Sequence, residues 1–371
     1  MKHRLFLIFL CIFLSSANTM RGVTTGSNTV LSVQTLITYT GTGNIILGGA
    51  LMNAGFTMSS GVTLSWGSYF PVLGPVTMGT GTMTLARDFL MGGSWFNSPV
   101  TLDATLNIKG TTILDGGGNV ITFGPSGIIA VAAGATVIIK NTTLKGLMTG
   151  DITMGSTASN LTLQDVTLIQ SGPLTLSTGN LNIVNDVLMT GSNIFTYSSA
   201  NALSINSLSM LEFDLGMTFS YASATNSLLT FSSSSSELFL NGASLFVGSA
   251  GLNLTTGTLV VANTSYLSTS SSISFGNSVS ANDLQVNILP SAQLQVSNGI
   301  LNYNNINASS LQMGSITSSI YMADGTTLNL FQSLNNGSSF VYFGNATLGT
   351  QGLASLTGSA AVVGALNYTT F

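Results

Sequence analysis

Short segments with apolar residues at every second position recur along most of the chain. Threonine, serine or asparagine usually stands between them. Seven examples are Val137–Ile139, Leu161–Leu163, Leu174–Leu176, Leu181–Ile183, Leu203–Ile205, Leu238–Leu240 and Leu294–Val296. This alternation predicts β-strands with one buried face, and no segment shows a sustained helical period. Because the segments span only three to five residues, they suit the sides of a coil better than a conventional sandwich.

A two-strand unit is repeated in the sequence. Three segments of the form Pro-apolar-Thr-apolar are each followed, six or seven residues later, by an apolar residue of a second predicted strand: Pro75–Met78 by Leu85, Pro99–Leu102 by Ile108, and Pro173–Leu176 by Ile183. Repeats of short strands are typical of solenoids, in which each coil stacks on the one before it.

A second repeat places an amide or carboxylate between two strands. Asn141, Asp165, Asn185 and Asn206 follow one another at intervals of 24, 20 and 21 residues. Asparagine and aspartate tolerate the left-handed backbone conformation and bond to nearby backbone groups, so we expect them at the corners of coils. The sequence therefore predicts an all-β parallel β-helix (solenoid) with about 20–24 residues per coil.

The segment Thr112–Phe123, which contains Asp115-Gly-Gly-Gly-Asn119, resembles the right-handed parallel β-helix, or pectin-lyase-like, superfamily, as do the Ile-x-Asn-x-x-Leu corners. The likeness is greatest to non-enzymatic members on bacterial surfaces, such as adhesin and autotransporter passenger regions. It covers about residues 75–345 and implies a right-handed coil. Taken without the resemblance, Asp115–Asn119 is a tight turn between two strands in which glycine supplies a positive φ.

The N-terminus has the pattern of a secretory signal peptide. Two basic residues within Met1–Arg4 precede the apolar run Leu5–Leu14, and Ser15, Ser16 and Ala17 supply the small residues of a cleavage site. The run is too short to span a membrane as a helix. We therefore expect a secreted, extracellular or cell-surface protein with no membrane span after removal of the signal.

The remaining chain divides into three predicted regions. Residues 18–97 are expected to form an irregular β region or cap, residues 98–350 the parallel β-helix, and residues 351–371 an apolar C-terminal end or cap. Bulky residues suit the end of a solenoid because they cover its open core. Trp66 and Trp95 in the first region also leave open an aromatic platform for a ligand.

Charged residues are 5% of the sequence, against about 25% in ordinary globular proteins. Beyond the signal, the basic residues are Arg21, Arg87, Lys109, Lys140 and Lys145, while eight acids lie between Asp151 and Asp324. Nucleic-acid binding requires clustered lysine or arginine, so this class is excluded. The only histidine and cysteine are His3 and Cys11. Both precede the cleavage site, which leaves no imidazole or thiol for catalysis or metal binding.

One pair of carboxylates is close in sequence. Glu212 and Asp214 alternate with Leu211 and Phe213, which predicts that both project from the outer face of one strand. Such a pair could serve acid–base hydrolysis, or it could be a solvated strand surface. Asp165, Asp186 and Glu212 could also gather across coils around a cation.

The sequence contains no calcium-binding loop motif. We accordingly predict no catalytic, cofactor-binding or metal-binding residue and no cofactor. The expected function is that of a structural or adhesive solenoid, not an enzyme, whose surface partner is a glycan or a protein. A polysaccharide lyase or hydrolase that uses Glu212 and Asp214 is the alternative.

The signal pattern yields a direct prediction. N-terminal sequencing of the natively produced protein should begin near Asn18, because cleavage is expected after Ala17. Recovery of the intact chain with Met1 from a soluble cytoplasmic fraction would contradict export.

Overall fold

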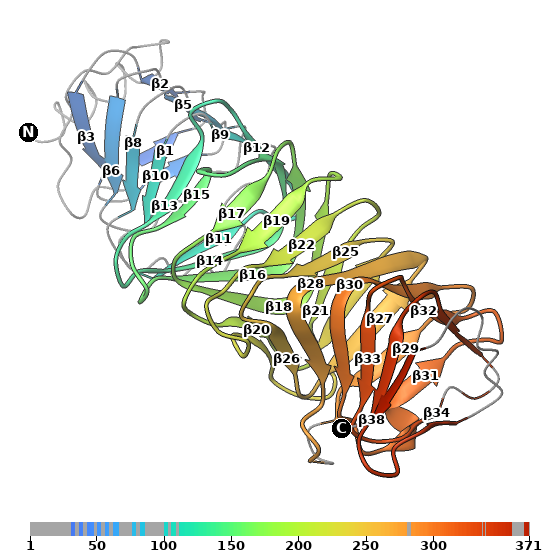
Figure 1. The fold of residues 1–371 in the computed structure, drawn as a ribbon. Helices are drawn as coiled ribbons and strands as arrows, with labels where there is room; N and C mark the ends of the chain where they lie inside the picture. The colour runs from blue at the N-terminus through green and yellow to red at the C-terminus, as the bar shows by residue number, and fades with distance from the viewer. Residues whose placement is uncertain are drawn as a thin grey trace, which may run out of the picture. The chain divides into compact units, whose positions relative to one another are not determined.

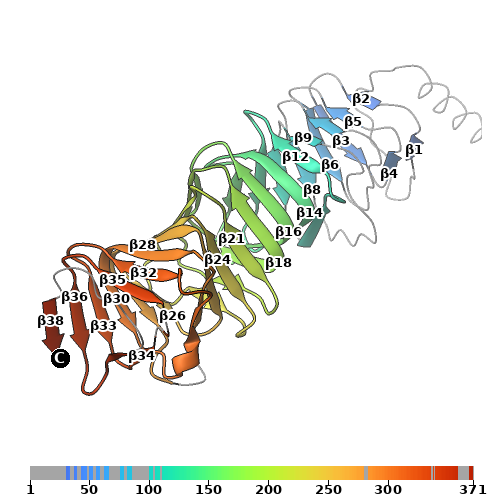
Figure 2. The ribbon, with the colours of Figure 1, turned by 90° about the vertical axis from the view of Figure 1, so that its right-hand side faces the viewer.

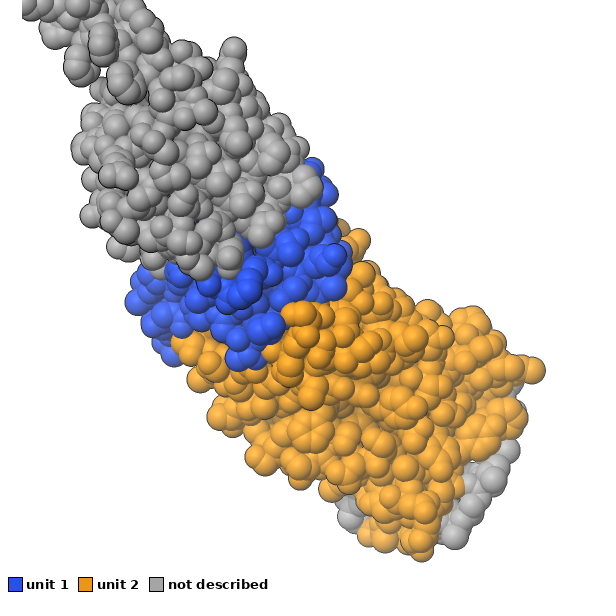
Figure 3. Space-filling model, turned by 90° about the horizontal axis from the view of Figure 1, so that it is seen from above, with its two compact units in different colours: residues 1–169 blue, residues 170–371 orange. Residues whose placement is uncertain are grey.

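The computed structural model describes strands between residues 31 and 108 and then residues 111–279, 283–335, 337, 339–357 and 367–370. The predicted signal peptide (residues 1–17), Trp95 and the side chain of Trp66 lie outside the described part. The chain divides into two compact units, residues 1–169 (unit 1) and 170–371 (unit 2), coloured separately in Figure 3. The described residues are almost entirely β, with one short 3₁₀ helix, η2 (Ala308–Ser310).

The strands of unit 1 pair in parallel from coil to coil (Figure 1). One six-stranded sheet follows the order β15–β13–β10–β8–β6–β3. Its strands are β3 (Gly43–Leu47), β6 (Val62–Trp66), β8 (Thr82–Leu85), β10 (Thr105–Ile108), β13 (Ile128–Val131) and β15 (Ile152–Met154). A second series contains β2 (Ile37–Tyr39), β5 (Phe56–Met58), β7 (Val76–Met78), β9 (Val100–Leu102), β11 (Thr111–Asp115), β12 (Val120–Phe123), β14 (Thr136–Leu147) and β16 (Asn160–Gln170), and β1 (Leu31–Val33) pairs with β4 (Ala50–Met52).

Parallel pairing continues on both sides of residue 97, where the sequence predicted the end of a cap. β8 pairs with β10, and β7 pairs with β9. The repeated two-strand unit is confirmed, since β7 and β8, β9 and β10, and β17 and β18 occupy the three repeats.

Unit 2 is a parallel solenoid whose coils contribute strands to three walls (Figures 1 and 2). The first wall contains β17 (Leu174–Leu176), β19 (Ile194–Tyr197), β22 (Thr218–Tyr221), β25 (Ser244–Val247), the first part of β28 (Thr264–Phe275), the first part of β30 (Gln293–Tyr303), β32 (Ser319–Met322) and β35 (Phe340–Phe343).

The second wall contains the first part of β18 (Asn180–Thr190), β20 (Leu203–Ile205), β23 (Leu229–Phe231), β26 (Leu252–Leu254), the last parts of β28 and β30, β33 (Thr327–Leu330), β36 (Thr347–Thr350) and β38 (Asn367–Thr370). The third wall contains the last part of β18, β21 (Met210–Phe213), β24 (Glu237–Asn241), β27 (Thr258–Ala262), β29 (Gln285–Ile288) and β31 (Leu311–Met313). β34 (Leu334–Asn335) and β37 (Leu356–Thr357) form a separate pair.

The predicted coil length is too narrow. Ser319 pairs with Phe340, 21 residues later, whereas Thr264 pairs with Gln293, 29 residues later. The walls keep their strand lengths from coil to coil, so the additional residues lie in the connections between them. A spacing taken from three corners could not include these longer connections.

The left-handed corners are confirmed at three of the four predicted positions. Asn141, Asp165 and Asn185 have φ angles of 50°, 53° and 54°. At the fourth corner the positive φ falls on Leu208, at 57°, and not on Asn206. Paired strands continue through such corners, so β14, β16 and β18 are 11 or 12 residues long and exceed the predicted three to five.

Alternate residues of each wall point into the solenoid and form its core. All seven alternating segments quoted above fall within described strands, and their leucine side chains are buried. In unit 2 the interior contains a cluster of three phenylalanines, Phe195, Phe213 and Phe219, each 0% exposed. The ring centroids of Phe213 and Phe219 are 4.7 Å apart with planes 7° from parallel. Phe213 on the third wall thus packs against the first wall.

Buried serines connect successive coils at their corners. Ser199 donates its hydroxyl to the carbonyl of Gly179, and Ser223 donates to the carbonyl of Ser199, each at 2.7 Å. Ser236 and Ser318 do the same toward Asn206 and Leu289. These bonds satisfy carbonyl groups that the walls leave without a strand partner. Part of the serine content is therefore structural.

The phenylalanine cluster predicts a large loss of stability on truncation. Phe213→Ala should lower the free energy of unfolding by about 3–5 kcal/mol, because it removes a buried ring and leaves a cavity. Thr196→Ala, on the outer face of the first wall, is the control and should change it by less than about 0.5 kcal/mol. Chemical denaturation followed by circular dichroism measures both. Equal stability of the two variants would contradict the packing described.

Candidate functional site

The outer faces of the three walls of unit 2 differ in chemistry. We call the third the acidic wall, because Asp186, Glu212, Asp214 and Glu237 lie on or directly beside its strands. The second is the amide wall, after the stacked residues Asn253, Ser274, Asn302 and Asn329. The first is the aromatic wall, after the outward residues Phe246, Tyr266, Tyr321, Phe340 and Tyr342.

Glu212 and Asp214 share the outer face of the acidic wall, as the alternation predicted. Asn241 on the next coil donates from Nδ2 to Glu212 Oε1 at 3.2 Å and to Asp214 Oδ1 at 3.3 Å. The Thr190 hydroxyl on the preceding coil donates to Asp214 Oδ2 at 3.2 Å. Asn263 donates to Asn241 Oδ1 at 2.8 Å, which orients the bridging amide. The two carboxylates are thereby held close to each other.

The surroundings of Glu212 favour its protonated form. Its register partners are Leu188 on one side and Phe239 on the other, so the carboxyl stands between apolar side chains. Burial raises the pKa of Glu212, the hydrogen bond from Asn241 lowers it, and the charges of Asp214 and Asp186 raise it further, with a net rise above its ordinary value. A carboxyl of this kind is chemically suited to donate a proton.

The predicted gathering of three carboxylates around a cation concerns residues of both units. Asp165 is an exposed left-handed corner of unit 1, whereas Asp186 and Glu212 belong to unit 2. Among the described residues, no three histidine, cysteine, aspartate or glutamate side chains form a group that could hold a metal ion.

The Asp115-Gly-Gly-Gly-Asn119 segment in unit 1 is a structural turn. Asp115 accepts hydrogen bonds from Gly117 N at 3.0 Å and Asn141 Nδ2 at 3.1 Å, and Lys140 Nζ lies 3.2 Å from its second oxygen. Burial raises the pKa of Asp115, but these bonds and the Lys140 charge outweigh it and hold the pKa below its ordinary value. Gly116 passes so close to Thr142 that a Cβ atom would lie 2.5 Å from it.

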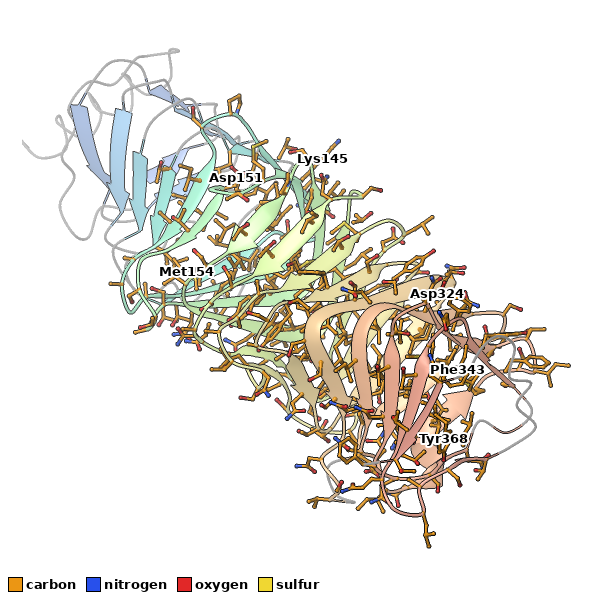
Figure 4. All side chains as sticks on the ribbon, in the orientation of Figure 1. Lys145, Asp151, Met154, Asp324, Phe343 and Tyr368 are labelled. Carbon is orange, nitrogen blue, oxygen red and sulfur yellow. The ribbon has the colours of Figure 1, made fainter. Side chains whose placement is uncertain are left out.

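Other acids also fix loops and corners. Asp283 is 7% exposed and accepts from Ile306 N, Asn307 N and the Ser310 hydroxyl, at 2.7–3.1 Å. Asp324, labelled in Figure 4, accepts from Asn345 N at 2.7 Å. The charges of these acids therefore serve the backbone, which leaves Glu212 and Asp214 as the carboxylates with the chemistry of a site.

The aromatic wall was not found from the sequence. Ser244, Tyr266, Gln295, Tyr321 and Tyr342 are register partners on successive coils and form one outward column. Phe246 and Phe340 lie two residues along the same wall face, and the rings of Phe340 and Tyr342 stack at 5.5 Å. The Phe-x-x-Phe and Tyr-rich segments are far apart in the sequence, so only the register brings them together.

The amide wall is a ladder of side-chain hydrogen bonds. Asn329 Nδ2 donates to Asn302 Oδ1 at 3.0 Å, and Asn302 Nδ2 donates to the Ser274 hydroxyl at 3.2 Å. Stacked amides of this kind use their hydrogen-bonding capacity on one another. The aromatic and acidic walls therefore have more groups available to a partner than the amide wall does.

The fold defines the class of this protein as a parallel β-solenoid. Comparison with known proteins finds no matching family model, no similar curated protein and no similar solved structure. The resemblance to the pectin-lyase-like superfamily thus rests on the sequence pattern alone. Within the described ranges, no helix has the length and apolar character needed to cross a membrane.

The pKa of Glu212 predicts a pH-dependent effect of its removal. Because the folded-state pKa lies above the unfolded one, the ionised carboxylate costs stability at pH 7, and this cost disappears as the pH falls below the unfolded pKa. Glu212→Gln keeps an acceptor for Asn241 and should raise the melting temperature at pH 7 but not at pH 3. Glu237→Gln, which removes a charge on the adjacent strand, is the matched control. A Glu212→Gln effect independent of pH would contradict this account.

Proposed function

We propose that this protein is an extracellular or cell-surface solenoid that contacts a glycan or a protein without catalysis. One observation carries the proposal: the aromatic wall presents five aromatic side chains outward, and none of the outward positions on its described strands is charged. Phe246 and Tyr266 are 40% and 37% exposed. Aromatic side chains grouped on a surface are typical of recognition sites.

The charge distribution supports binding without turnover. Unit 2 contains six acids, namely Asp186, Glu212, Asp214, Glu237, Asp283 and Asp324, and no lysine, arginine or histidine. Cleavage of a sugar chain by elimination or hydrolysis requires a proton donor, a base or nucleophile, and a group that stabilises developing charge. Glu212 and Asp214 offer the first two, and no cationic side chain of this unit offers the third.

The export signal supports the location. Residues 1–17 direct the chain out of the cytoplasm in this proposal. A fold without disulfides suits this location when its walls are fully hydrogen-bonded from coil to coil.

A polysaccharide lyase or hydrolase remains the second candidate, and one observation favours it. Glu212 has a raised pKa and stands beside Asp214, so one carboxyl could be protonated while the other is ionised. Pairs of carboxyl groups with these opposite states perform glycoside hydrolysis.

An activity and binding panel tests the proposal. The purified protein should release no reducing ends and no unsaturated products from plant, algal and microbial polysaccharides, with or without calcium, while at least one glycan or cell-surface protein is retained by it. Cleavage that is abolished by Glu212→Gln or Asp214→Asn, but not by Glu237→Gln, would establish the enzymatic alternative instead.

A further inference from the structure

We propose that the aromatic wall binds a neutral, extended, β-linked glycan chain that lies along the stacking direction of the coils. The site is formed by Tyr266, Gln295, Tyr321, Tyr342 and Phe340. This inference rests on the proposed binding function and adds the location of the site, the class of ligand and its direction.

The spacing of the column matches a polymer of sugar rings. Tyr266, Gln295, Tyr321 and Tyr342 lie on four consecutive coils in register. Strands of a sheet are separated by about 4.8 Å. This distance is close to the length of one sugar residue in an extended β-1,4-linked chain, so successive sugars can meet successive side chains without a change of register.

The side chains have the chemistry that sugars require. The apolar face of a pyranose ring stacks on aromatic rings, and its hydroxyl groups bond to amides and phenols. Gln295 places an amide between Tyr266 and Tyr321 in the column. The hydroxyls of Tyr266, Tyr321 and Tyr342 have no hydrogen-bond partner within the described part of the chain, so they are available to a ligand.

The interior tyrosines provide a contrast. Tyr197 is buried, and its hydroxyl donates to the Asn201 carbonyl at 2.9 Å. Tyr221 is buried, and its hydroxyl donates to the Thr225 carbonyl at 2.6 Å. These two rings pack the core and close a corner. The outward tyrosines perform neither task, and their cost in exposed apolar area is explained by a ligand that covers them.

Charge selects a neutral ligand over an acidic one. Unit 2 has no cationic side chain and six acidic ones, so a uronate polymer would meet net repulsion. The outward positions of the aromatic wall carry no charge of either sign. A neutral chain such as a β-1,4-glucan, xylan or mannan complements this surface, whereas polygalacturonate does not.

Isothermal titration of the purified exported protein tests the site. The probes are the hexasaccharides of β-1,4-glucose, β-1,4-xylose and β-1,4-mannose, with the hexamer of galacturonic acid as the acidic comparison. The wild type should bind at least one neutral probe and not the acidic one. Tyr266→Ala and Tyr321→Ala should each weaken that binding about threefold to tenfold, the loss expected for one stacked aromatic ring.

Two controls separate stacking from folding. Tyr321→Phe keeps the ring and should bind within about twofold of the wild type. Phe239→Ala removes an outward aromatic from the acidic wall and should leave binding unchanged. Circular dichroism and melting temperatures close to those of the wild type establish that each variant is folded.

The outcomes distinguish this inference from the proposed function. Neutral glycan binding that is unaffected by Tyr266→Ala, Tyr321→Ala and Tyr342→Ala would overturn the assigned site but leave the glycan-binding function in place. Preference for the galacturonate probe would overturn the assigned ligand class. Binding of a surface protein but of no glycan would overturn the inference and leave adhesion standing, and the absence of any partner would overturn both.

Discussion

Parallel, in-register hydrogen bonding between successive coils is the constraint on which the structure depends. Each wall strand bonds to the coil before it and the coil after it, so its backbone is satisfied only when the strands stay aligned. Alignment fixes which side chains face inward, since neighbours along a strand point to opposite faces. The phenylalanine cluster inside and the column of tyrosines outside are both consequences of this one requirement.

The same constraint accounts for the low charge of the chain. Stacked residues in a parallel column lie about 4.8 Å apart, where like charges repel. The described acidic wall avoids such contacts: Glu212 has Leu188 and Phe239 as partners, and Met210 separates Asp186 from Glu237. Neutral side chains can instead stack without penalty, and asparagines gain hydrogen bonds by doing so. A solenoid of this kind therefore favours serine, threonine, asparagine and aromatic residues on its outer faces.

The sequence predicts the strands and corners because both depend on local chemistry. Alternation alone identifies segments such as Leu181–Ile183, and the tolerance of asparagine and aspartate for positive φ identifies Asn141, Asp165 and Asn185. Leu208 shows where this reasoning fails, because a corner held by the pairing on both sides can impose a positive φ on a residue that disfavours it.

The shared face of Glu212 and Asp214 also follows from strand alternation. The aromatic wall does not, because its members come from coils of unequal length, and their alignment depends on pairings between residues 20 to 29 positions apart. The buried serines were missed for a related reason. Ser199 and Ser223 look like solvent-facing residues until the carbonyl of the preceding coil is placed beside them.

Engineered disulfides measure the register most directly. Ser204 and Thr230 are partners on adjacent coils, and their hydroxyl oxygens lie 3.0 Å apart on the outer face. In a Cys11→Ser background, Ser204→Cys with Thr230→Cys should oxidise readily, because stacked Cα atoms fall within the range of a disulfide, whereas Ser204→Cys with Ser232→Cys should not. Rapid oxidation of the offset pair and none of the aligned pair would contradict in-register parallel stacking.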